Sequence, residues 1–107
     1  MKVLFDQGTP APLRRALSAF DVKIAREMNW DRLENGELLR AAEEAFDAFI
    51  TTDQGLKYQQ NNVKRKLAIL VLPTTSWPRI QSNVEIVVQA VERLSPGDFV
   101  ELAFPAE

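Results

Sequence analysis

Two apolar runs of the chain each lead directly into an aspartate. Lys2–Phe5 precedes Asp6, and Phe49–Thr52 precedes Asp53. Each run has the length and composition of a short buried strand. Two helices are predicted between the runs, so both strands belong to one parallel sheet. The carboxyl ends of parallel strands meet at one edge of the sheet, where ligands bind in open α/β folds. We therefore expect Asp6 and Asp53 at that edge.

The rest of the chain continues this alternation of strands and helices. Strands are predicted at residues 2–5, 22–25, 48–52, 67–72 and 99–104, and helices at residues 10–20, 37–45 and 77–94. Leu67–Leu72 is apolar throughout, as a strand covered on both faces should be. Thr9 is the expected N-cap of the first helix, and Asn35-Gly36 is expected to form a turn. The order predicts one three-layer α/β/α domain over residues 1–107, with a mainly parallel central sheet.

Composition excludes several kinds of chemistry. The 107 residues include no histidine and no cysteine, which removes imidazole acid–base catalysis, imidazole-bound or thiolate-bound zinc, and disulfides. The sequence shows no signal-peptide pattern, and no apolar run approaches the ~20 residues that span a bilayer. We therefore expect a cytoplasmic protein with no membrane partner. The net charge of −2 argues against non-specific adhesion to nucleic acid but permits a local basic surface.

A third acid, Glu37, opens the helix that leads into the second of the two strands. Each acid has a simple structural interpretation, because aspartates form turns and an acid in the first turn of a helix stabilises its dipole. Together the three carboxylates are suited to holding a hard divalent cation. Like charges within ~4–6 Å of one another repel unless a cation lies between them. The sequence thus predicts a metal site formed by Asp6, Glu37 and Asp53.

Three stretches of the chain, KVLFDQGTP, NGELLRAAEEAFDAFITTDQGLKYQQN and TTSWPRI, resemble the PIN-like domains. More narrowly, they resemble the short bacterial PIN-like proteins that are grouped with toxin–antitoxin systems. The resemblance covers nearly the whole chain, and Thr51-Thr52-Asp53 is its most specific local piece. It implies that Asp6, Glu37 and Asp53 hold Mg²⁺ or Mn²⁺ and that the Thr51 hydroxyl supports the site. It also implies hydrolysis of RNA phosphodiester bonds and inhibition by an antitoxin protein.

Basic side chains near this edge are candidates for holding RNA. Arg14, Lys57 or Arg79 would contact the phosphates on either side of the scissile bond, although each alone is more simply a solvated surface charge. Trp30 and Trp77 are interpreted as packing residues rather than as platforms for stacked bases.

Two alternatives to the nuclease remain open. PIN nucleases commonly carry an acidic or amide residue two places after the acid that corresponds to Asp53, and this chain has Gly55 there. That difference favours a catalytically weakened PIN-like binding or regulatory module. The second alternative is a structural homodimer, formed through the strand at residues 99–104 or the helix at residues 77–94.

Overall fold

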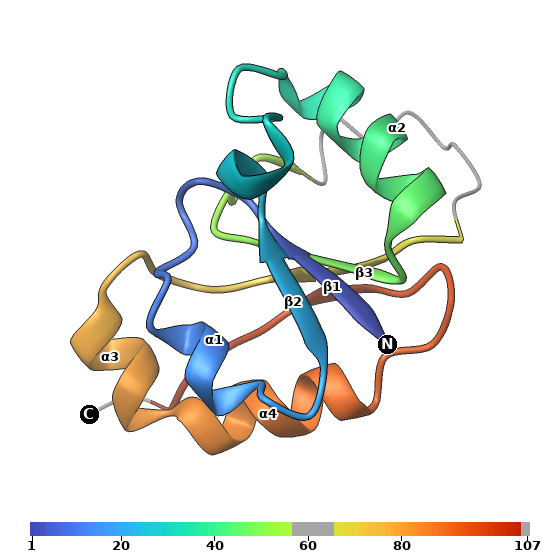
Figure 1. The fold of residues 1–107 in the computed structure, drawn as a ribbon. Coiled ribbons are helices and arrows are strands. Elements are labelled where there is room, and N and C mark those ends of the chain that lie inside the picture. Colours follow the sequence, from blue (N-terminus) through green and yellow to red (C-terminus); the bar gives the residue numbers. More distant parts are fainter. Residues whose placement is uncertain (57–65, 106–107) are drawn as a thin grey trace.

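A parallel sheet with the strand order β2-β1-β3-β4-β5 forms the centre of the computed structural model, which describes residues 1–56 and 66–105 (Figure 1). Its strands are β1 (Lys2–Phe5), β2 (Asp21–Ile24), β3 (Ala48–Thr51), β4 (Ala68–Val71) and β5 (Phe99–Glu101). The helices are α1 (Leu13–Ala16), α2 (Asn35–Ala45), α3 (Trp77–Ser82) and α4 (Val84–Glu92), with a 3₁₀ turn η1 (Ala25–Met28). Every neighbouring pair of strands is parallel, so the predicted α/β fold with a parallel sheet is confirmed.

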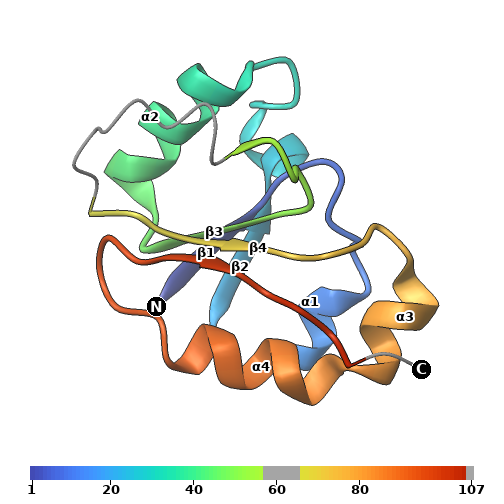
Figure 2. The ribbon, with the colours of Figure 1, turned by 180° about the vertical axis from the view of Figure 1, so that it is seen from behind.

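Helices cover both faces of this sheet, which gives three layers (Figures 1 and 2). α1, α3 and α4 pack on one face, and η1 and α2 pack on the other. The side chains of β1 alternate between the two, because Val3 and Phe5 join the first apolar cluster whereas Leu4 joins the second. β3 and β4 are buried at every position, as expected for strands covered on both faces. β5 lies at one edge of the sheet and ends at Glu101, so the strand predicted over residues 99–104 is shorter than expected.

The prediction of a helix over residues 10–20 is wrong in extent. Only α1 is α-helical there, and the residues on either side form turns closed by bonds between residues three apart. The Leu13 N–H donates to the Pro10 carbonyl at 3.1 Å, and the Phe20 N–H donates to the Leu17 carbonyl at 2.9 Å. Pro12 has no N–H to donate, and it occupies the N-cap position of α1. Thr9, the expected cap, bonds to Asp6 instead.

The single helix predicted over residues 77–94 is two helices in the structure. They meet at Asn83, whose backbone angles (φ −121°, ψ 23°) lie outside the helical range. The Asn83 side-chain amide donates to the Arg79 carbonyl at 2.8 Å, and the Ser82 hydroxyl donates to the Pro78 carbonyl at 3.0 Å. Polar side chains that bond the carbonyl four residues earlier compete with the helical hydrogen bonds and bend the helix.

The turn predicted at Asn35-Gly36 is instead the first turn of α2, which begins two residues earlier than expected.

Within the two described ranges, no helix has the length and apolar character needed to cross a bilayer.

Candidate functional site

The connections of the sheet change direction between β1 and β3. β1 leads to β2 on one side of it, whereas β3 leads to β4 on the other side. In parallel α/β sheets such a switch point leaves a crevice at the carboxyl ends of the two strands, and ligands bind there. Asp6 immediately follows β1, and Asp53 lies two residues beyond β3. The topology therefore brings both predicted acids to this edge.

Buried hydroxyl groups hold the carboxylate of Asp6 in one orientation. Thr9 donates to Oδ1 from its backbone N–H at 3.0 Å and from its hydroxyl at 2.6 Å, and the Thr51 hydroxyl donates to Oδ2. Thr9 and Thr51 are only 4% and 1% exposed, so water does not compete for these bonds. A carboxylate offers about four acceptor positions, so one position at Oδ2 remains for a ligand.

Thr51 links the two acidic segments. Its hydroxyl oxygen, while donating to Asp6, accepts the backbone N–H of Asp53 at 3.0 Å. The Asp53 carboxylate in turn accepts the N–H of Gly55 at 2.9 Å through Oδ1. The Thr51-Thr52-Asp53 sequence is thus a hydrogen-bonded turn that places Asp53 beside the end of β1.

Glu37, the remaining predicted acid, lies on a helix and not at the end of a strand. It is exposed in the first turn of α2, the helix that covers one face of the sheet. Within residues 1–56 and 66–105, no three acidic side chains form a group that could hold one metal ion. The structure therefore brings together the segments of Asp6 and Asp53, and it does not add Glu37 to them as a third member of such a group.

The predicted basic residues differ in their surroundings. Both terminal nitrogens of Arg14 donate to the carboxylate of Glu27, so its charge is already paired. This hydrogen-bonded guanidinium, together with the Ile24 N–H, lowers the pKa of the Glu27 carboxyl. Arg79 is exposed on α3, and Lys57 lies outside the described residues. Of the two bases that can be placed, only Arg79 is without a carboxylate partner in the described part of the chain.

A cavity of about 360 Å³ opens beside Asp6 at the same edge. The segment Gln7–Ala11 forms one wall, Ile24 and Arg26 form a second, and Thr75 and Trp77 form a third. Sequence reasoning did not assign Thr9, Arg26 or Trp77 to a site. A threonine three residues after an aspartate was the available signal for Thr9, because such an aspartate often accepts bonds from the turn that follows it.

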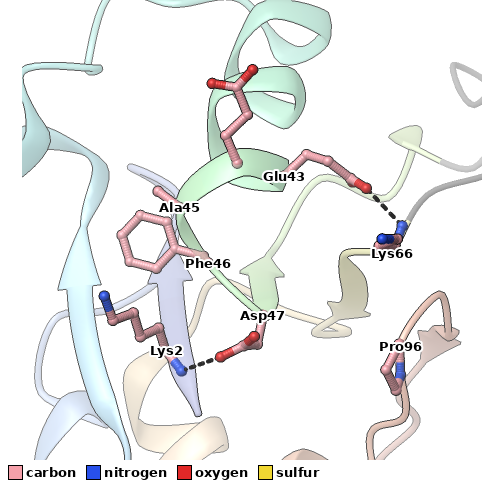
Figure 3. Close-up of a pocket in the computed structure, with 8 residues that line it drawn as sticks. Lys2, Glu43, Ala45, Phe46, Asp47, Lys66 and Pro96 are labelled. Carbon is pink, nitrogen blue, oxygen red and sulfur yellow. Dashed lines mark hydrogen bonds between the residues drawn. The ribbon is translucent and has the colours of Figure 1, made fainter.

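A second cavity, of about 350 Å³, lies at the opposite, amino-terminal edge of the strands (Figure 3). Two of the carboxylates that line it, Glu43 and Asp47, bond to backbone groups. Glu43 accepts the N–H groups of Lys66 and Leu67 at 2.7 and 3.3 Å, and Asp47 accepts the Lys2 N–H at 2.8 Å (Figure 3). These two carboxylates accept hydrogen bonds from backbone N–H groups at the start of β1 and just before β4. Their role is therefore structural.

Comparisons of the chain with protein-family models, with curated proteins and with solved structures found no match. The protein has an α/β fold in which the hydroxyls of Thr9 and Thr51 orient the carboxylate of Asp6 at the switch point of the parallel sheet.

Proposed function

We propose that the chain is a metal-dependent ribonuclease of PIN-like type, whose active site is the edge between β1 and β3. The observation that carries the proposal is the carboxylate of Asp6, fixed by Thr9 and Thr51 at the switch point and joined through Thr51 to the segment of Asp53. A protein that only needed to end a strand would not require two buried hydroxyls to orient an acid.

The donor set at this edge fits a magnesium or manganese ion. Asp6 keeps one acceptor position at Oδ2, and Asp53 supplies a second carboxylate. Mg²⁺ is commonly held by one or two carboxylates together with substrate phosphates and water. When bound, such a cation activates water for attack on a phosphodiester and offsets the negative charge that develops. Thr9 and Thr51 then act by keeping Asp6 in the orientation in which Oδ2 is available.

Glu37 enters the proposal through the resemblance, as a third ligand. Its position in the first turn of α2 also gives it a separate role, because an acid there stabilises a helix by about 0.3–1 kcal/mol. Glu37→Gln separates the two roles. A loss of metal affinity would support a ligand, whereas a small loss of stability with unchanged affinity would restrict Glu37 to the helix.

The first test is isothermal calorimetry with Mg²⁺ and Mn²⁺. We expect wild-type protein to bind and Asp53→Asn to bind at least about tenfold more weakly, because the substitution removes one of two anionic oxygen ligands of a hard divalent cation. Asp21→Asn is the matched control, since Asp21 is exposed at the start of β2, at the other end of the strands. Equal binding by all three proteins would reject the metal site.

The second test is cleavage of single-stranded RNA in the presence of the metal that binds. Asp6→Asn keeps the shape of the side chain, and we expect it to lower the rate more than about 100-fold, beyond the effect usual for outer-shell partners. In the toxin–antitoxin setting that the resemblance implies, a partner protein would inhibit this activity. Cleavage that survives Asp6→Asn would come from a contaminant and would reject the proposal.

A binding module is the second candidate, and the hydrogen bonds at the site favour it. Protein donors fill three acceptor positions of Asp6, and Gly55 donates its N–H to Asp53 where the PIN pattern has an acidic or amide side chain. Under this candidate the edge binds RNA without hydrolysing it. RNA binding with no cleavage by the wild-type protein would select the binding module.

A further inference from the structure

The cavity beside Asp6 has three walls of different chemistry. Thr9 lines it and donates to Oδ1 of Asp6, so the cavity begins one side chain away from the proposed catalytic carboxylate. Its volume of about 360 Å³ lies within the range of about 300–1,000 Å³ that small-ligand pockets occupy. Its location and size together suit one unit of a substrate that continues past the reacting bond.

Arg26 gives the cavity a positive wall. The side chain is exposed on η1, and none of the described residues that line the cavity is acidic. The neighbouring Glu27 is engaged by Arg14, in the one ion pair found in the described part of the chain, so it does not neutralise Arg26. A planar guanidinium with this freedom is suited to binding a phosphate through two hydrogen bonds.

Trp77 gives the cavity an aromatic ring. The ring is half-buried at the start of α3, where it packs against the first apolar cluster and also lines the cavity. Trp30 differs, because its ring meets Phe46 edge-on with the ring centroids 6.0 Å apart and does not line this cavity. A partly held aromatic ring at a cavity wall is the arrangement on which nucleobases stack in single-strand binding sites.

We infer that this cavity receives one nucleotide of a single-stranded RNA substrate, with a phosphate on Arg26 and the base on Trp77. The inference rests on the proposed function, because the adjoining carboxylate is the one that would act on the next phosphodiester. It makes Arg26 and Trp77 substrate-positioning residues. Arg26 then supplies the positive charge that was predicted for Arg14 on this side of the site, because Arg14 is paired with Glu27.

The test is binding of a fluorescently labelled octanucleotide of uridine, measured by anisotropy at several salt concentrations. The protein is the full chain carrying Asp6→Asn, so that turnover does not interfere. We expect Arg26→Gln to weaken binding about tenfold, as loss of a hydrogen bond to a charged group should. The slope of log affinity against log salt should also fall by about 0.7, the value for one phosphate contact on a single strand. Arg93→Gln, at the far end of α4, is the matched control and should change neither quantity.

Trp77 also supplies a fluorescence readout of binding. In a protein that also carries Trp30→Phe, the emission of Trp77 should be quenched by the unlabelled octanucleotide with the same midpoint as the anisotropy. Trp77→Leu should weaken binding about tenfold and leave the salt slope unchanged, because stacking involves no counterion release.

The outcomes separate this inference from the proposed function. Cleavage by the wild-type protein, combined with equal binding by Arg26→Gln and Arg93→Gln, would leave the ribonuclease intact and overturn the nucleotide site. Unchanged Trp77 emission at saturating RNA would also overturn it. Absence of cleavage, combined with the expected effects at Arg26 and Trp77, would reject the ribonuclease and support the nucleotide site as part of a binding module.

Discussion

At the scale of single residues, the Thr51 hydroxyl is the group on which the candidate site depends most. It donates to Asp6 and accepts from the backbone of Asp53, so one buried oxygen sets the positions of both acidic segments. Its role beside Asp53 follows from the sequence pattern. The role of Thr9 does not, because a threonine before a proline is equally suited to cap a helix, and only the path of the chain decides between the two partners.

Replacing the Thr51 hydroxyl by a methyl group should destabilise the fold. Thr51→Val leaves the Asp53 N–H without its acceptor and Oδ2 of Asp6 without its donor, at a position 1% exposed. We expect a loss of about 1–3 kcal/mol in the free energy of unfolding, measured in urea. Thr51→Ser keeps the hydroxyl and should lose less. Equal stability of the wild-type and valine proteins would contradict the bonding scheme.

Gly8 makes a close approach to Thr52 that tests the packing of the two strand ends. A Cβ added at Gly8 would lie 2.6 Å from the Thr52 hydroxyl oxygen, so Gly8→Ala forces that side chain to move. We expect a net destabilisation of about 1 kcal/mol, because the clash exceeds the entropy that alanine removes from the unfolded chain.

The Thr52→Ala background provides the control for this substitution. With the hydroxyl gone, Gly8→Ala should be neutral or stabilising, and a double-mutant cycle should give a coupling of at least about 0.5 kcal/mol. Additive effects of the two substitutions would show that positions 8 and 52 do not meet.

At the scale of elements, the strands were easier to predict than the helices. β1, β3 and β4 are short apolar runs whose burial on both faces leaves no competing interpretation. The helices around Pro12 and Asn83 depended on local competition for backbone hydrogen bonds. The spacing of apolar residues does not show this competition. The helices predicted over residues 10–20 and 77–94 were therefore both too long.

The Arg14–Glu27 pair ties α1 to η1 and should give a pH-dependent contribution to stability. A carboxyl whose pKa is lowered by folding stabilises the folded state above its unfolded pKa, and this stabilisation is lost as the pH falls through the folded value. Arg14→Gln should raise the pKa of Glu27 toward the ordinary value of a glutamate carboxyl, as measured by NMR titration. The stability difference between this variant and wild type should shrink as the pH falls below that value.

Arg15→Gln is the matched control for the Arg14 substitution, because Arg15 is an exposed neighbour on α1. The Glu27 pKa should not change in that variant. A Glu27 pKa that is equally unaffected by Arg14→Gln would mean that the ion pair does not form in solution.

Glu43 fastens α2 to the entry of β4, and its removal should destabilise that junction. Its two oxygens accept the N–H groups of Lys66 and Leu67, as Figure 3 shows for Lys66. Glu43→Ala should lower the free energy of unfolding by about 1 kcal/mol in a denaturant titration. Glu44→Ala removes the same charge from an exposed position and should have an effect below about 0.5 kcal/mol. Equal effects would assign the loss to charge or helix propensity.

At the scale of the whole molecule, strand order decides how much of the site the sequence can reveal. Asp6 and Asp53 were predictable because a residue at the end of a strand is placed by the sheet itself. The place of Glu37 cannot be predicted in this way, because it lies on α2, whose position depends on how that helix packs over the sheet. The cavity walls were beyond reach for the same reason, since Arg26 and Trp77 come from segments that only the three-dimensional arrangement brings together.

The two tryptophans report on opposite faces of the sheet and therefore test whether it unfolds as one unit. Trp30 packs with the cluster under α2, and Trp77 packs with the cluster under α1, α3 and α4. The strands contribute side chains to both clusters, so loss of either cluster removes the support of the other. Urea titrations of Trp30→Phe and Trp77→Phe should each follow one transition, whose midpoint by the remaining tryptophan coincides with that by circular dichroism. Leu39→Ala, in the α2 cluster, should cost about 2–5 kcal/mol and lower the midpoint reported by Trp77 as much as that reported by Trp30. A midpoint at Trp77 that does not respond to Leu39→Ala would mean that the two faces unfold independently, and the shared sheet could not then hold Asp6 and Asp53 in a fixed relation.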